Sequence, residues 1–399
     1  MVTYSRAEAA ERVGVSVGDV DRLIEVGILT PKDVERLSPG DVRRVELAQS
    51  LAAAGIPLDG VGASMRRGEV SLDFLDAPVY ERFSLLSPVT FQELSDRSHV
   101  PVSLLTVMRE AAGSAQPSPD DLVRDNELTI ASFLEAQIAA GFRPAAIERL
   151  MRVQGESLRR IAETEADWWR SEVMEPAAAA GERPDDMSAT ELSMKLAGLS
   201  ESAVLAMYHS QQMHAWTGNI IGSLEATLTA AGLHSRLERP PAMCFLDITG
   251  YTRLTQERGD EAAADLAAQL GRLVQRTSVQ HGGRPVKWLG DGVMFHFPNP
   301  GPGVVAALDM VDGVVTAGLP PAHVGLHAGP VIFQEGDYYG ATVNVASRIA
   351  EYARPGEVLV SQEVVEASSG TDVAFREIGP VELKGVADAM HLHAASRPI

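Results

Sequence analysis

The sequence of 399 residues contains a single cysteine, Cys244, which excludes an internal disulfide and a cysteine-rich zinc site. Aromatic residues make up only 5%, so the cores must be built mainly from Ala, Val, Leu and Ile. No uninterrupted apolar run approaches the roughly 20 residues that span a bilayer. The first residues lack the basic and apolar regions of a signal peptide. We therefore expect a soluble, cytoplasmic protein with no membrane partner.

Basic residues are also scarce. The chain has 34 Lys and Arg against 54 Asp and Glu, which gives a net charge of −20. A chain this acidic has no overall attraction for nucleic acid. Any phosphate-bearing ligand must be held by individual cations, metal ions or backbone amides. The length exceeds that of one typical domain and indicates two or three.

The chain changes character at Pro240 and Pro241. Before them, apolar residues recur every three or four positions, as in helices, whereas short alternating runs and two clear helices follow them. The pattern predicts an all-α N-terminal half followed by an α+β domain. We expect a helical region at 1–199, a connecting helix at 200–238 and the α+β domain at 239–399.

The N-terminal half contains an internal repeat. The stretch that starts at Glu8 is similar to the one that starts at Glu93, and the motifs SPGD and SPDD follow in the same order. Matched order at a nearly constant offset predicts two copies of one helical unit. The copies are expected at about 4–68 and 90–155.

Each copy opens with a helix-turn-helix pattern, and YSRAEAAERVGVS in the first copy resembles the DNA-binding end of mercury-resistance-type regulators. However, the second helix of this copy holds Asp19, Asp21 and Glu25 against one cation, Arg22. Proteins that read the major groove need arginines, lysines or amides facing the DNA. A protein scaffold is therefore favoured over DNA binding, which stays open as an alternative.

A long helix is expected from Glu201 to Ala231. Large side chains recur along it every three or four residues and form one face, which we call the seam: His209, Met213, Trp216, Ile220, Leu224 and Leu228. The seam is expected to pack either against the N-terminal helices or against the same helix of a second chain.

Three segments after Pro241 carry residues suited to chemistry. In AMCFLDITGYT, a buried strand ends at Asp247 before a helix start, where a carboxylate can hold a divalent cation while free amides receive phosphate oxygens. In VKWLGDGVMF, Asp-Gly predicts a hairpin, and Lys287 and Asp291 share strand parity. In GDYYGATVNVASR, Asn344 and Arg348 lie on one helical face, an arrangement that suits an oxyanion or phosphate.

Together these segments resemble the class III nucleotidyl cyclase catalytic domain, whose motifs occur here in order as FLDITGYT, VKWLGDG, HAGP, GDYYGATVNVASR and ELKGV. The resemblance covers about 241–399 and implies an α+β fold of ferredoxin-like, palm-like type. It implies conversion of ATP or GTP to the 3',5'-cyclic monophosphate and pyrophosphate. It also implies a homodimer with two composite sites, in which the metal-binding aspartates come from one protomer, and the pair that reads the purine and the pair that stabilises the transition state come from its partner.

The resemblance assigns a role to each matched residue. Asp247 and Asp291, with the carbonyl group of Ile248, match the ligands of two Mg²⁺ or Mn²⁺ ions. Lys287 and Asp337 match the pair that reads the purine, and this pair implies ATP because lysine donates to adenine N1 and aspartate accepts from the amine.

Further matches concern the phosphates and the ribose. Asn344 and Arg348 match the pair that stabilises the transition state. The remaining matches are substrate-binding residues: Thr249, Gly250, Tyr251, Thr252 and Lys384, the last of which matches a lysine that holds the terminal phosphates.

We therefore expect an adenylyl cyclase controlled by its N-terminal helical half. A guanylyl cyclase, a DNA-binding regulator with a nucleotide-sensing cyclase-like domain, and a catalytically silent nucleotide-binding module remain as alternatives. The sequence leaves the regulatory signal open among protons, a lipid, bicarbonate and a protein partner. It also does not choose between Mg²⁺ and Mn²⁺, or assign a cyclase subclass.

Overall fold

The computed structural model describes residues 3–33, 35–77, 80, 85–181, 187–233, 240–250, 259–290 and 292–398. The chain divides into two compact units, Met1–Ser223 and Leu224–Ile399. Each unit has its own hydrophobic clusters. Helix α10 (Met187–Ala230) runs through residue 199, so the three-part division expected from the sequence stays a prediction.

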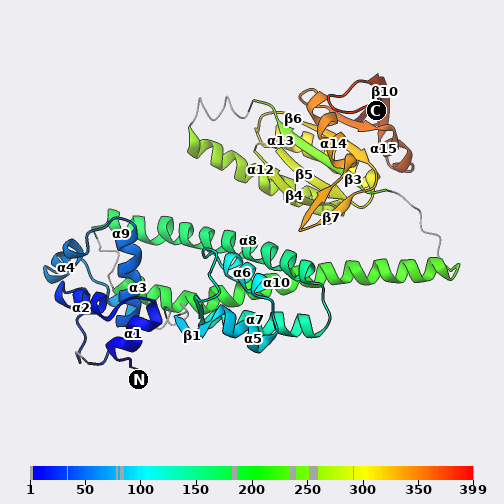
Figure 1. The fold of residues 1–399 in the computed structure, drawn as a ribbon. Helices are drawn as coiled ribbons and strands as arrows, with labels where there is room; N and C mark the ends of the chain where they lie inside the picture. Colours follow the sequence, from blue (N-terminus) through cyan, green and yellow to red (C-terminus); the bar gives the residue numbers. More distant parts are fainter. Residues whose placement is uncertain are drawn as a thin grey trace. The chain divides into compact units, whose positions relative to one another are not determined.

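The N-terminal unit is helical, as predicted, and its helices recur as two sets (Figure 1). The first set comprises α1 (Arg6–Val13), α2 (Val17–Glu25), α3 (Pro39–Ala53) and α4 (Leu58–Arg66). The second comprises α5 (Phe91–Ser98), α6 (Val102–Ala111), α7 (Asp125–Ala139) and α8 (Pro144–Trp169). Each helix of the second set begins 85 or 86 residues after its counterpart in the first. The smaller elements of this unit are a 3₁₀ turn (Asp73–Asp76), β1 (Leu86–Thr90), β2 (Leu122–Arg124), a π-helical turn (Arg170–Met174) and α9 (Glu175–Ala179).

Serine side chains cap the first three helices of the first set. Ser16 accepts a hydrogen bond from the backbone N–H of Asp19 and so caps α2, which confirms the helix-turn-helix start. Ser38, in the SPGD motif, caps α3 in the same way. The SPDD motif does not cap α7, which follows β2 and begins after Arg124. Matching these two motifs was therefore wrong, because strand β2 lies between SPDD and the helix.

The second set has a buried ion pair in its core. Arg109, on α6, donates from Nε and Nη2 to the Glu127 carboxylate at 2.8 and 2.6 Å, and its guanidinium lies over the Phe91 ring. Glu127 also accepts from the backbone N–H of Arg124 at 2.7 Å. The lone cation of this helix therefore points into the core. In the first set, Arg22 faces Asp59 at 3.3 Å. Neither helix thus offers an unengaged cation to a DNA phosphate, which weighs against the DNA-binding alternative.

Helix α10 contains almost all of the stretch predicted to be helical. The large apolar side chains of the seam are between 42% and 61% exposed in the single chain: Met213, Trp216, Ile220, Leu224 and Leu228. Between Glu201 and Glu225 the sequence has no Asp, Glu, Lys or Arg. Even so, none of the helices in the described ranges is long and apolar enough to cross a bilayer. Among the described residues, the seam is therefore an exposed apolar surface.

The C-terminal unit is built on a seven-stranded sheet in the order β10-β11-β9-β6-β3-β5-β4, in agreement with the predicted mixed fold. Its strands are β3 (Ala242–Ile248), β4 (Arg284–Leu289), β5 (Gly292–Phe297), β6 (Ala322–Ala328), β9 (Val358–Ser361), β10 (Ala374–Val381) and β11 (Met390–Ser396). A separate hairpin joins β7 (Ile332–Gln334) to β8 (Asp337–Tyr339), and the helices are α12 (Asp260–Gln280), α13 (Pro300–Thr316), α14 (Ala341–Tyr352) and α15 (Gln362–Ala367). Adjacent strands are antiparallel except for β6 and β9.

Strand alternation divides this core into two layers. Cys244 and Leu246 of β3 join the cluster that α12 and α13 cover, whereas Met243 faces Ala346 of α14 on the opposite side. At Gly325 of β6, an added Cβ would lie 2.1 Å from the backbone nitrogen of Ala350, so only glycine lets α14 come this close. The sheet is thus covered on both faces, and α14 is held close against β6.

The buried ion pair makes a stability prediction. We expect Glu127→Gln to lower the free energy of unfolding of the helical unit by about 3 kcal/mol, because it leaves the buried Arg109 charge uncompensated. Urea unfolding followed by far-UV circular dichroism measures this change. The matched control is Glu148→Gln, which breaks an exposed pair with Arg152 and should cost at most about 0.5 kcal/mol. Equal losses in the two variants would contradict the role assigned to burial.

Candidate functional site

The end of β3 presents Asp247 at an open corner of the sheet. The carboxylate is 46% exposed, and its Oδ1 accepts a hydrogen bond from the backbone N–H of Ile248 at 3.0 Å. The chain then leaves the strand, because Thr249 N–H donates to the Pro321 carbonyl and Gly250 adopts a φ of +79°. A carboxylate therefore stands at the point where the buried strand ends, as the sequence predicted.

Two neighbouring strands shape the surroundings of this carboxylate. Gly292 on β5 pairs with Asp247, and a Cβ there would lie 3.4 Å from Asp247 Oδ1, so the glycine leaves room beside the acid. On β6, His323 pairs with Asp247 from the other side. Its Nε2 lies 3.8 Å from Asp247 Oδ2, and its Nδ1 lies 3.3 Å from Thr249 Oγ1. Sequence analysis missed His323, because only the pairing of β6 with β3 brings it here.

Three of the predicted site residues, Tyr251, Thr252 and Asp291, lie outside the described residues. Asp291 directly precedes Gly292 in the sequence. Among the residues that the structure describes, no group of three or more His, Cys, Asp or Glu side chains could hold a metal ion. The donors that are described at this corner, the Asp247 carboxylate and the Ile248 carbonyl, are hard oxygens of the kind that Mg²⁺ and Mn²⁺ prefer. They fit part of a divalent metal site.

Lys287 and Asp337 are brought into contact as an ion pair between β4 and β8. The pair is partly buried, with exposed fractions of 40% for lysine and 21% for aspartate. The second carboxylate oxygen of Asp337 accepts the backbone N–H of Tyr338 at 2.8 Å. This side of the site therefore offers one cationic donor and one anionic acceptor next to each other.

A cluster of rings lies against this pair, and sequence analysis did not identify it. The guanidinium of Arg284 donates to the Tyr338 hydroxyl at 2.6 Å, and the Tyr338 ring stacks on His296, with centroids 4.4 Å apart and planes at 6°. Burial, together with the Arg284 charge, lowers the pKa of His296 to about 4. His296 is therefore a neutral ring at neutral pH.

The two remaining predicted groups lie on α14 and in a turn. Asn344 is exposed and Arg348 is half-buried on the same helical face. Arg348 donates to both carboxylate oxygens of Glu351, at 2.5 and 2.6 Å. Lys384 is exposed in the turn between β10 and β11. Both hydrogen bonds come from Nη1, so the guanidinium has further N–H donors on Nε and Nη2 for another anion.

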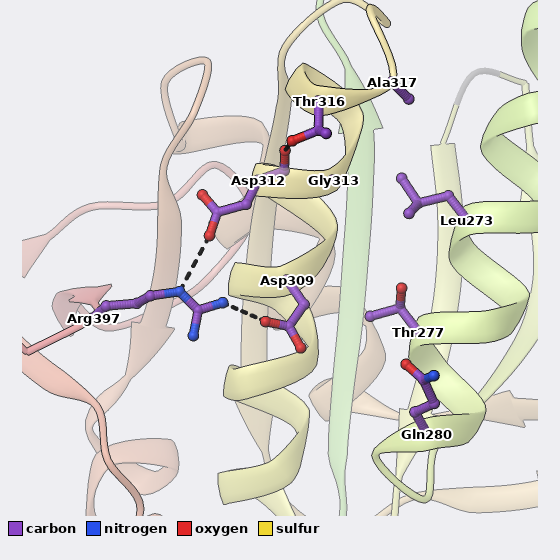
Figure 2. Close-up of a pocket in the computed structure, with 9 residues that line it drawn as sticks. All are labelled: Leu273, Thr277, Gln280, Asp309, Asp312, Gly313, Thr316, Ala317 and Arg397. Carbon is purple, nitrogen blue, oxygen red and sulfur yellow. Dashed lines mark hydrogen bonds and ion pairs between the residues drawn. The ribbon is translucent and has the colours of Figure 1, made fainter.

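A separate hollow of about 520 Å³ lies between α12 and α13, on the face of the sheet opposite α14 (Figure 2). Arg397, which lines the hollow, contacts Asp309 and Asp312. His281, outside the lining, contacts Asp309 at 2.7 Å. Burial opposes ionisation of Asp309, but the hydrogen bonds from Arg397 and His281 prevail and lower the pKa of its carboxyl group. The hollow shares no residue with the predicted site, so it is not the place where the expected chemistry would occur.

Comparison with known proteins gives several matches. A solved adenylyl cyclase from P. aeruginosa is 22% identical, with a TM-score of 0.36, and the match covers 40% of this chain and 94% of that one. A pH-sensitive adenylate cyclase from Mycobacterium tuberculosis is 28% identical over 319 residues, which cover 77% of this chain and 78% of the relative. An adenylate cyclase from Streptomyces coelicolor is 27% identical over 253 residues, which cover 62% of this chain and 64% of the relative.

The family comparison defines the C-terminal region. Residues 237–395 match the model of the adenylate and guanylate cyclase catalytic domain. This range contains the seven-stranded sheet and the predicted site residues. The chain therefore carries a class III nucleotidyl cyclase catalytic domain at its C-terminal end, preceded by a helical N-terminal region.

Proposed function

We propose that this nucleotidyl cyclase is an adenylyl cyclase, which converts ATP to 3',5'-cyclic AMP and pyrophosphate. The observation that carries the proposal is the contact between Lys287 and Asp337. Adenine presents an acceptor at N1 beside a donor amine, so a lysine and an aspartate match its edge. Guanine presents the opposite polarity and would place a donor against the lysine. The relatives named adenylate cyclases support the same choice.

The reaction needs the ribose 3'-hydroxyl to lose a proton and attack the α-phosphorus in line with the departing pyrophosphate. Asp247, Asp291 and the Ile248 carbonyl are the proposed metal ligands. When bound, divalent cations would lower the pKa of the hydroxyl and neutralise the leaving group. Gly292 keeps space beside Asp247, and the Asp247 carboxylate is already oriented by the Ile248 N–H.

The opposite side of the reaction centre is assigned to α14. Arg348 would face the charge that develops on the α-phosphoryl group, a contact typically worth about 3 kcal/mol when it is preorganised. Its present partner, Glu351, is an exposed carboxylate, so the exchange of one anion for another costs little. Asn344 would orient the ribose, and Lys384 would hold the terminal phosphates. Gly250, Tyr251 and Thr252 would supply backbone amides to the phosphates, because the Thr249 N–H already donates to the Pro321 carbonyl.

We further propose that the active form is a homodimer with two composite sites. Within one chain Asp247 contacts the Ile248 N–H and His323, whereas Lys287 contacts Asp337 and Arg348 contacts Glu351. These groups lie on different elements and do not converge in one described cluster. A two-fold pair of chains would let the metal corner of one protomer meet the purine pair and α14 of its partner.

The N-terminal helices are the proposed regulatory part, and α10 is the element that would transmit their state. The seam is exposed and apolar in the single chain, so it can pack against the seam of a second chain. A relative that aligns over most of the chain is named a pH-sensitive cyclase, and protons are therefore the first signal to test.

The proposed reaction predicts turnover of ATP. Purified protein with Mg²⁺ or Mn²⁺ should form cyclic AMP from ATP in preference to cyclic GMP from GTP. Asp247→Asn should lower kcat by at least about 100-fold, because the metal loses a charged ligand. The control, Asp312→Asn, removes a carboxylate on the opposite face of the sheet and should leave kcat unchanged. Full activity of Asp247→Asn would refute the proposed chemistry.

Complementation tests the composite sites. Neither Asp247→Ala nor Arg348→Ala should be active alone. In a heterodimer, one site collects both mutations and the other collects neither, so random mixing should restore about a quarter of wild-type activity. Co-expression with two different affinity tags, followed by measurement of cyclic AMP formation, reads this out. No recovery in a verified heterodimer would show that each chain builds its site alone.

A charge placed on the seam tests its role. Ile220→Glu should weaken self-association and change specific activity several-fold, because it sets a carboxylate in the apolar contact. Asn219→Glu adds the same charge one residue away and should have little effect. Self-association is measured by sedimentation, and activity by steady-state cyclic AMP formation. Both are measured from about pH 5 to pH 8, the range in which histidine side chains ordinarily change charge. Identical behaviour of the two variants would remove α10 from the proposed control.

A further inference from the structure

The β7–β8 hairpin, which carries Asp337, is weakly attached to the rest of its unit. It forms a two-stranded sheet of its own, apart from the seven-stranded sheet. Ile332, Phe333 and Tyr339 are 62%, 56% and 48% exposed, whereas Tyr338 is 7% exposed and is the single fully buried residue of the hairpin. The position of Asp337 therefore depends largely on what holds Tyr338.

Tyr338 is buried in a cluster with Met243, Met294 and Ala346, and directional contacts also hold it. Its hydroxyl accepts a hydrogen bond from Arg284 at 2.6 Å, its ring stacks on His296, and the Phe333 ring packs against it with centroids 5.0 Å apart. The Arg284 guanidinium also lies 5.3 Å from the Phe333 ring centroid. Charge-assisted hydrogen bonds and contacts between a cation and a ring are directional, so they fix the hairpin more strictly than apolar packing alone.

An irregularity in β4 sets Arg284 and Lys287 on one face. Residues three apart in a regular strand point to opposite faces. Here Arg284 pairs with His296 and Pro285 with Phe295, but Lys287 pairs with Met294, so one extra residue is inserted between Pro285 and Lys287. The bulge turns Lys287 to the face of Arg284, where the hairpin lies.

Two side-chain contacts consequently join β4 to β8. Arg284 of β4 holds Tyr338 of β8, and three residues further along β4 Lys287 holds Asp337, the neighbour of Tyr338. The Tyr338 backbone N–H also donates to Asp337 Oδ1, so any movement of the tyrosine moves the carboxylate. The contact between Lys287 and Asp337 is suited to reading a base, whereas the hydrogen bond from Arg284 Nη2 to the Tyr338 hydroxyl joins two side chains of the protein to each other.

We propose that Arg284 and Tyr338 are positioning residues for purine recognition: their hydrogen bond fixes the β7–β8 hairpin against β4 and so sets the spacing between Lys287 and Asp337. This inference rests on the proposed function, because it takes Lys287 and Asp337 as the groups that read the base. It assigns the selectivity for adenine to two side chains that do not touch the nucleotide.

The neutral state of His296 is consistent with this arrangement. A protonated imidazole would stand beside the Arg284 guanidinium and face the same tyrosine ring, so like charges would repel. The buried ring keeps its pKa near 4, well below neutral pH, and stacking is preserved across the range in which the enzyme is to be assayed. The other charged groups at the cluster are Lys287 and Asp337, which neutralise each other.

The test compares two tyrosines in the full-length protein. Tyr338→Phe removes one hydroxyl and keeps the stacked ring, whereas Tyr352→Phe removes a hydroxyl from an exposed tyrosine at the end of α14. We expect Tyr338→Phe to lower the ratio of kcat/KM for ATP to that for GTP by about tenfold, mainly through a higher KM for ATP, because small displacements of a binding group are costly. Tyr352→Phe should keep the wild-type ratio.

Arg284 variants test the same link from the other end. Arg284→Met should lower the ratio as much as Tyr338→Phe, and the double variant should be no worse than the more affected single variant, since both remove one interaction. Arg284→Lys keeps a donor and should recover part of the ratio. Thermal unfolding of each variant shows whether the fold is retained.

The outcomes separate this inference from the proposed function. A wild-type enzyme that prefers ATP, with a Tyr338→Phe variant that keeps this preference or loses turnover of both nucleotides equally, would overturn the positioning role and leave the cyclase proposal standing. Competition of ATP and GTP for a fluorescent ATP analogue gives a readout without turnover. If the wild type makes no cyclic product, the proposed reaction fails. In that case the ratio of ATP affinity to GTP affinity, taken from the competition experiment, still tests the positioning role. A lower ratio in Tyr338→Phe but not in Tyr352→Phe supports this role, and equal ratios in the two variants refute it.

Discussion

The catalytic unit is constrained by a sheet that is covered on both faces. Along β3, Cys244 and Leu246 are buried under α12 and α13, and Met243 is buried under α14. Charged groups cannot be placed inside such a strand without a large desolvation cost. Asp247 therefore occurs where β3 emerges, Lys287 lies on the edge strand β4, Asp337 on the hairpin and Arg348 on α14. The location of the site follows from the need to keep its charges solvated.

Local features of this site could be predicted from the sequence because local chemistry determines them. The end of a buried strand at Asp247, the hairpin around Gly290 and the start of α14 after Gly340 all follow from alternation and glycine. The bulge before Lys287 and the placement of His323 beside Asp247 could not. Both depend on strand register, which is set by long-range packing and not by neighbouring residues.

In the N-terminal unit, the repeat could be predicted from the sequence, but the burial of a charged side chain could not. The repeat could be found because the two copies are similar to each other, and the second set of helices begins 85 or 86 residues after the first. Arg109 is the one cation in the sequence of α6. The structure buries it against Glu127, which lies 18 residues away and on another helix. A composition argument counts charges, but only the fold shows which of them face the solvent.

The chain is strongly acidic, but part of α10 carries no charged side chain. This difference is the strongest physical reason to propose that α10 brings two chains together and so controls the cyclase domain. Two copies of a chain with a net charge of −20 repel each other over most of their surfaces. The stretch between Glu201 and Glu225 has no acidic or basic residue, and its seam is exposed. Bringing two chains together along this stretch avoids the repulsion and buries apolar area, and both effects favour association. The proposed control element therefore lies where a second copy can approach at the lowest electrostatic cost.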